Sequence, residues 1–187
     1  MNALTVLKQD HGNVEALFKQ FEGLDEGDVD EKRRVVDHLI EQLSVHAAIE
    51  EQVFYPAVRQ ASDEVKGTVL EGLEEHHIVT WTLSELETMA PADERFDAKV
   101  RVLIESVRHH VEEEEGELFD AVRAAVPTQE LDALGEALAK AKQTAPTRPH
   151  PRTPDEPPLN VIVGIPIAVM DKAFTTGRRA VERLLSR

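Results

Sequence analysis

The sequence HAAIEEQVFYPAV at residues 46–58 recurs 64 positions later as HVEEEEGELFDAV at residues 110–122. Both copies begin with a histidine that is followed four residues later by a glutamate. In an α-helix, residues at i and i+4 lie about 40° apart around the axis and about 6 Å apart along it, so each pair faces one point. The repeat therefore predicts two helices that each present an imidazole and a carboxylate together. These pairs are His46/Glu50 and His110/Glu114.

The repeat extends upstream, because Asp10-His11 matches Glu75-His76 at an offset of 65 positions. The first two helices of the chain therefore resemble the next two, as a duplicated helical hairpin would. Packing the two hairpins about a pseudo-two-fold axis brings the repeated histidines together in the middle.

Apolar residues recur at spacings of three and four nearly everywhere before residue 143, which predicts helices rather than strands. Four long helices joined by short loops favour an all-α fold, an up-down-up-down four-helix bundle. A shorter fifth helix with Ala/Leu spacing is suited to lying on the bundle. The expected helices span residues 2–22, 30–59, 63–89, 94–126 and 129–142.

Each long helix carries an apolar seam, and each seam is interrupted near its middle by the polar residues of the repeat. In the first helix the seam runs Leu7, His11, Val14, and in the fourth it contains His110 and Glu114. The inward-facing polar residues are His11, His46, Glu50, His76, His110 and Glu114.

These six histidine and glutamate residues at one level of a core point to bound cations. A single histidine on an apolar stripe is usually a hydrogen-bonded core residue, but four interrupted seams favour a metal site. Ionised Glu50 and Glu114 would be costly in a core unless they were paired, protonated or metal-bound. Two cations bridged by both carboxylates satisfy them. The chain has no cysteine, so thiolate ligands are excluded.

The end of the chain has a different composition from the bundle. We expect a bundle domain over residues 1–143, a proline-rich linker over 144–159 and an amphipathic helix over 160–187. The last segment carries an apolar run, Val161–Met170, and a basic end, so we expect it to dock on the bundle or on a second subunit. Weak binding to a membrane surface is the alternative, because basic amphipathic tails also bind anionic lipid.

The charge of the chain restricts its partners, and its hydropathy restricts its location. The net charge is −15, and residues 146–187 hold seven Lys or Arg against four Asp or Glu, so the bundle is strongly acidic. Such a surface repels nucleic acid, and we expect none as a partner. No signal peptide is recognisable, and the longest apolar stretch is too short to span a bilayer. We therefore expect a cytoplasmic protein, a homodimer being one arrangement, and no membrane segment.

Four stretches resemble the signature segments of the hemerythrin-like, or HHE cation-binding, domains. They are DHGNVEALF, HAAIEEQVFYP, EHHIVTWTLSEL and HHVEEEEGELF. The resemblance covers about residues 1–126 and implies a non-haem centre of two iron ions, with room for an oxo or hydroxo bridge. It also implies that His11, His46, His76 and His110 are terminal ligands and that Glu50 and Glu114 bridge. Such a centre binds dioxygen or reacts with peroxide or nitric oxide.

The chain departs from oxygen-carrying hemerythrins at Thr80, where they place a second histidine one turn after the ligand of the third helix. His77 and Tyr55 are candidates for an additional ligand, although His77 lies in a polar register and Tyr55 is also suited to packing at the rim. The spacing differs from the Glu-x-x-His pairs of ferritin-like proteins, and no HExxH zinc motif is present.

Two functional classes stay open. We expect a protein that reacts with hydrogen peroxide or related small oxidants, because an iron with fewer protein nitrogens offers them a position. In that case it is a peroxide-decomposing oxidoreductase. The alternative is a module that binds or senses dioxygen, nitric oxide or iron without turnover.

Overall fold

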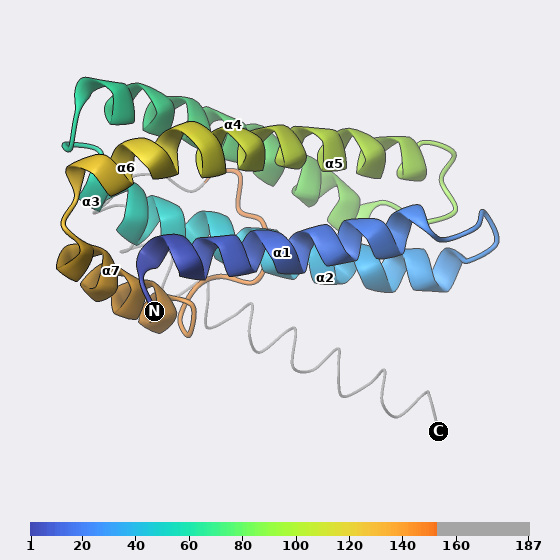
Figure 1. The fold of residues 1–187 in the computed structure, drawn as a ribbon. Coiled ribbons are helices and arrows are strands. Elements are labelled where there is room, and N and C mark those ends of the chain that lie inside the picture. Colours follow the sequence, from blue (N-terminus) through green and yellow to red (C-terminus); the bar gives the residue numbers. More distant parts are fainter. Residues whose placement is uncertain (153–187) are drawn as a thin grey trace.

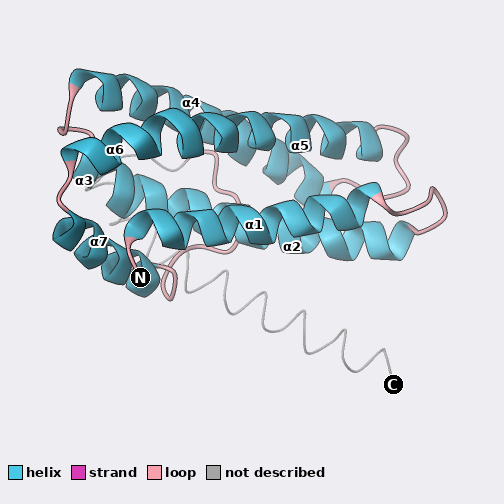
Figure 2. Ribbon diagram, viewed as in Figure 1, coloured by secondary structure: helices cyan, strands magenta, loops and turns pink. Residues whose placement is uncertain are grey.

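Two helical hairpins form the body of the molecule in the computed structural model, which describes residues 1–152 (Figure 1). The first hairpin is α1 against α2, and the second is α4 against α5, which confirms the up-down-up-down bundle (Figure 2). The helical elements, with π-helical segments written η, are α1 Ala3–Glu22, α2 Val29–Ile49, η1 Glu50–Phe54, α3 Tyr55–Val58, α4 Asp63–Thr88, α5 Phe96–Glu113, η2 Glu114–Leu118, α6 Phe119–Ala125 and α7 Thr128–Ala141.

The predicted helices agree with the observed ones to within two residues at each end. The second predicted helix is the continuous rod α2–η1–α3, and the fourth is the rod α5–η2–α6. Helix α4 begins where expected because the Ser62 side chain accepts a hydrogen bond from the Val65 N–H, at 3.1 Å.

Two π-helical turns were not anticipated by the sequence pattern. Segments η1 and η2 begin at Glu50 and Glu114, the two repeated glutamates, so both copies of the repeat widen at the same place. π-Helical turns inside α-helices are rare and occur frequently at functional sites. Pro56 follows the first of them and has no N–H to continue an α-helical ladder.

The core consists of two apolar clusters separated by a buried polar layer. One cluster lies near α7 and contains Phe54, Tyr55 and Phe119. The other lies toward the far ends of the hairpins and contains Phe18 and Phe96. The repeated histidines and glutamates are buried between them.

Helix α7 lies across the start of α1, as the picture of the fold shows (Figure 1). Gly135 permits this close approach, because a Cβ there would lie 2.1 Å from the Met1 carbonyl oxygen. At the end of the helix, Lys142 donates to Asp10 Oδ1 at 2.5 Å. The end of α7 thus contacts Asp10, the residue next to His11.

We expect Gly135→Ala to lower the free energy of unfolding by about 1–3 kcal/mol, because the added methyl meets backbone atoms that cannot rotate away. Gly67→Ala in α4 is the control, since nothing lies within 4 Å of a Cβ there and alanine should stabilise the helix by about 0.5–1 kcal/mol. Denaturant unfolding of both variants checks the difference in sign. Equal stabilisation by both would contradict the packing of α7 on α1.

The described part of the predicted linker, residues 144–152, is not helical and lies against the bundle. Ala145 and Thr147 are buried, and the Arg148 side chain donates to Glu87 of α4. These residues therefore do not form a spacer in solvent. The predicted helix at 160–187 lies outside the described residues. Within residues 1–152, no helix is both long enough and apolar enough to cross a bilayer.

Candidate metal centre

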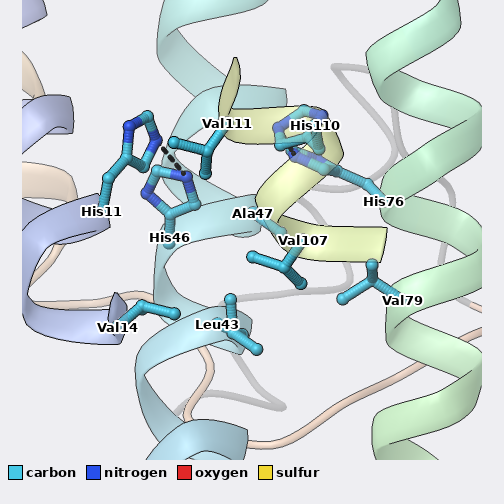
Figure 3. A pocket seen from close by; sticks show the side chains of 10 residues that line it. All are labelled: His11, Val14, Leu43, His46, Ala47, His76, Val79, Val107, His110 and Val111. Atoms are coloured by element: carbon cyan, nitrogen blue, oxygen red, sulfur yellow. Dashed lines mark hydrogen bonds between the residues drawn. The ribbon is translucent and has the colours of Figure 1, made fainter. Parts of the chain in front are cut away.

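The six predicted polar residues meet in the middle of the bundle. Their donor atoms form two groups, each with all atoms within 4.8 Å of one another, and Glu50 belongs to both. Figure 3 shows the four histidines converging from α1, α2, α4 and α5. The first group is His11, His46, Glu50 and Glu114, and the second is Glu50, His76 and His110.

The histidines are arranged as two close pairs. The Nε2 atoms of His11 and His46 lie 3.2 Å apart, and those of His76 and His110 lie 3.3 Å apart. Glu50 Oε2 lies 3.2 Å from the Nε2 atoms of both His46 and His76. One carboxylate oxygen therefore stands between the two pairs, as a bridging ligand would.

The buried carboxylates are approached by imidazole and have few other partners. Glu50 is 0% exposed and Glu114 is 2% exposed. Their Oε2 atoms lie 3.2 Å from Nε2 atoms of His11, His46 and His76, and neither Oε1 atom has a hydrogen-bond partner within residues 1–152. A buried carboxylate oxygen without a donor is strongly unfavourable, and cations remove that cost. The donor set of imidazoles and carboxylates therefore fits bound metal ions.

In the metal-free protein, bound protons compensate part of the buried negative charge. Burial, together with the charge of Glu114, raises the pKa of Glu50 to about 8. Burial also disfavours charged His76, but its contacts with Glu50 and Glu51 prevail and raise its pKa to about 10. In the metal-free centre, burial thus favours the neutral form of Glu50, whereas the neighbouring carboxylates favour the charged form of His76.

A ring of outer carboxylates orients the imidazoles. Glu115 lies 2.9 Å from Nδ1 of His11, Glu51 lies 3.2 Å from Nδ1 of His76, and Glu75 lies 2.7 Å from Nδ1 of His110. Asp10 faces Nδ1 of His46 at 3.7 Å, which is too long for a hydrogen bond. The three hydrogen bonds favour a proton on Nδ1, which leaves Nε2 as the inward-facing atom that can bind a metal ion once its own proton is released.

The outer carboxylates were missed by the sequence reasoning, although a signal was present. Each outer carboxylate is adjacent in sequence to a predicted ligand. These adjacent pairs are Asp10-His11, Glu50-Glu51, Glu75-His76 and Glu114-Glu115. The helix that supplies one ligand therefore also supports a ligand of a different helix.

The two halves of the centre differ in their outer charge. Lys142 pairs with Asp10, and Lys8 pairs with Glu115 at 3.0 Å, so both carboxylates beside His11 and His46 are compensated. Within residues 1–152, Glu51 and Glu75 have no lysine or arginine partner. The half that contains His76 and His110 is therefore the more negative one.

An apolar cavity of about 20 Å³ adjoins the histidines (Figure 3). This volume accommodates about one water-sized molecule. Besides the four histidines, its lining is entirely aliphatic, consisting of Val14, Leu43, Ala47, Val79, Val107 and Val111. Val79, not Thr80, lines it one turn after His76.

The two additional ligand candidates occupy opposite environments. His77 is exposed and belongs to neither inner group, so it is not retained as a ligand. Tyr55 is buried rather than packed at the rim, and its ring stacks on His76 with 5.5 Å between centroids. Gly72 permits this position, because a Cβ there would lie 2.9 Å from the Tyr55 hydroxyl. Burial raises the pKa of Tyr55 well above its usual range, so the phenol keeps its proton in the metal-free protein.

Comparisons with known proteins agree with this geometry. The profile of the hemerythrin HHE cation-binding domain matches residues 2–122. An uncharacterised hemerythrin-like protein of Schizosaccharomyces pombe is 24% identical over 165 residues, covering 88% of this chain and 80% of that protein. A solved structure of an HHE cation-binding domain protein from Mycobacterium kansasii superposes with a TM-score of 0.66 at 24% identity, over 76% of this chain and 86% of that one.

A third relative is larger. A DNA nickase of Nostoc sp. is 28% identical over 142 residues, which are 76% of this chain but 39% of the nickase. The chain thus spans well under half the length of that relative.

Proposed function

Because the chain belongs to the hemerythrin HHE cation-binding domain family, we propose that its buried centre binds two iron ions and reacts with hydrogen peroxide or related small oxidants. The observation that supports this most is the placement of the buried Glu50 carboxylate between two histidine pairs, with one oxygen 3.2 Å from the Nε2 atoms of both His46 and His76. In this proposal, His11, His46, His76 and His110 are terminal ligands, and Glu50 and Glu114 bridge.

Iron suits the ligands that the chain offers. Imidazole and carboxylate donors without thiolate favour iron over soft-metal chemistry. Two bound irons can together supply or accept the two electrons that the O–O bond of peroxide requires. Disproportionation of two peroxide molecules to two waters and one dioxygen balances without an external reductant.

The protein's own groups prepare this chemistry. Glu51 and Glu75 hold the Nδ1 protons of His76 and His110, which fixes both rings. The aliphatic cavity excludes bulk water from the inner face of the histidines. Because Val79 contributes no nitrogen there, a small molecule can approach that half of the centre.

One observation favours the second candidate, a module that binds or senses dioxygen, nitric oxide or iron without turnover. The cavity offers aliphatic carbon beside the histidines, with no hydroxyl or amide to bind the O–H groups of peroxide. Apolar diatomic molecules suit such a lining.

Oxygen evolution distinguishes the two candidates. Iron-loaded protein, freed of unbound iron, should release dioxygen from added peroxide more than about ten-fold faster than a His110→Ala variant, which lacks one ligand. An oxygen electrode measures the rate. If the rates are equal and an oxygenated spectrum forms and reverses under vacuum, the binding module replaces the enzyme.

The DNA nickase activity belongs to the Nostoc protein, and we do not extend it to this chain. The bundle is strongly acidic, so a phosphate backbone would be repelled. A cytoplasmic location and a homodimer stay predictions.

A further inference from the structure

A third group of metal-ligating side chains lies outside the buried centre. Donor atoms of Glu75 on α4 and of His109 and Glu113 on α5 all lie within 4.8 Å of one another. His109 Nε2 is 3.3 Å from Glu113 Oε1, and His109 is exposed while both glutamates are half-buried. A solvent ion can therefore reach this group directly.

Helix α5 carries two His-x-x-x-Glu pairs that differ by one residue. His110 and Glu114 face the core, whereas His109 and Glu113 are rotated by about 100° toward the surface. The outer pair meets Glu75, whose Oε2 already accepts a hydrogen bond from His110 Nδ1 at 2.7 Å. Glu75 thus touches a residue of the buried centre and belongs to the surface group.

A cavity of about 10 Å³ is lined by residues of both levels. Its lining includes Glu75 and Glu113 of the surface group and His110, Glu114 and Tyr55 of the interior. Glu114 is 2% exposed, its Oε2 lies 3.2 Å from His11 Nε2, and its Oε1 has no hydrogen-bond partner within the described residues. A buried carboxylate with one unpartnered oxygen therefore lines the same cavity as two residues of the surface group.

The charges around the buried centre favour the approach of a cation from the side of α4 and α5. On the side of His11 and His46, Lys8 and Lys142 pair with the outer carboxylates and repel an approaching cation. Between α4 and α5, Glu75 has no lysine or arginine partner within residues 1–152.

We propose that Glu75, His109 and Glu113 form a surface site for a divalent transition-metal ion and that iron enters the buried centre through it. One imidazole and two carboxylates suit Fe²⁺ or Zn²⁺. Three protein ligands leave further positions to water, so the ion exchanges readily. When the ion moves inward, the half-buried Glu113 is replaced as a ligand by the buried Glu114, the next residue in sequence. The binding part is independent of the proposed peroxide reaction, and the entry part rests on iron binding at the buried centre.

Zinc titration tests the surface site. Calorimetry of the iron-loaded full-length protein with Zn²⁺ should reveal one additional ion per chain, with the iron spectrum unchanged. His109→Ala and Glu113→Gln should each weaken that binding by at least about ten-fold. His77→Ala is the matched control, because His77 is exposed on α4 outside the group. Absence of an additional zinc ion, or equal affinity in His109→Ala, overturns the site.

Loading kinetics test the entry route. Metal-free protein is mixed with Fe²⁺ without oxygen, and the iron that resists a chelator is followed in time. His109→Ala should fill about ten-fold more slowly, to the same final iron content, whereas His77→Ala should match the unsubstituted protein. An unchanged rate in His109→Ala overturns the route. If the unsubstituted protein retains no iron, the entry part falls with the buried iron centre, while the zinc titration still decides the surface site.

Discussion

Replacing His110 by alanine is expected to cost at least about 100-fold in iron affinity, more than loss of an outer partner of a ligand would. His110 offers Nε2 to the pair with His76, and its Nδ1 is held by Glu75. Its removal takes one of only two histidines from that half of the centre. In the metal-free protein, the buried Glu114, one turn later on the same rod, would also lose His110, which together with a hydrogen bond from His11 holds its pKa low against the effect of burial.

The same substitution should weaken the fold. A cavity forms beside Gly72, and the buried carboxylates lose a compensating group, so we expect a loss of about 3–5 kcal/mol of unfolding free energy. Iron content after dialysis and denaturant unfolding measure the two effects. His77→Ala, on the exposed face of α4, should change neither. Full retention of two irons by His110→Ala would refute the assigned ligand role.

Much of the fold follows from the sequence because the informative pattern is local. Three-four spacing places Leu7, His11 and Val14 on one face whatever surrounds the helix. The offset of 64 between His46 and His110 then aligns the two hairpins without knowledge of side-chain contacts. Helix positions and the six inward residues could be predicted for this reason.

Other features depend on contacts between helices and could not be predicted from spacing. The π-helical turns at Glu50 and Glu114 shift the later register, so Tyr55 lies in the core against His76 instead of at the rim. The partner of His11 is Glu115, which is 104 positions away. Such a pairing is fixed only once α1 and η2 are packed together.

Contacts with α7 explain why the two halves of the repeated centre are not equivalent. Asp10 and Glu75 occupy equivalent positions of the repeat, but Asp10 is bound by Lys142 from α7 and Glu75 is not. Helix α7 exists once, so it breaks the symmetry of the hairpins. The outer carboxylates of the half that contains His76 have fewer cationic partners. Electrostatic attraction therefore stabilises an added cation most in that half.

Replacing Glu50 by glutamine should have opposite effects on the metal-free and metal-loaded protein. Glu50 is fully buried and its Oε1 has no hydrogen-bond partner within residues 1–152, so neutral glutamine removes a costly charge from the metal-free fold. In the loaded protein the same change removes the carboxylate shared by both ligand groups. We expect metal-free protein at pH 8 to gain about 2 kcal/mol, and loaded protein to lose iron and stability.

The pH dependence identifies the cause. The pKa of Glu50 is raised from 4.5 to about 8 in the folded metal-free protein. A raised carboxyl pKa means that the folded state holds the proton more tightly, so its stabilising effect is complete below pH 4.5 and is lost as pH rises through 8. His11 and His76, with pKa values raised to about 9 and about 10, add a loss of the same sign above pH 6.5. Glu50→Gln should therefore flatten the decline mainly between pH 4.5 and 8. Denaturant unfolding from pH 5 to 9, with the exposed Glu71→Gln as control, measures this. If Glu50→Gln and Glu71→Gln give the same profile, Glu50 does not carry a buried proton, and the argument that cations replace it fails.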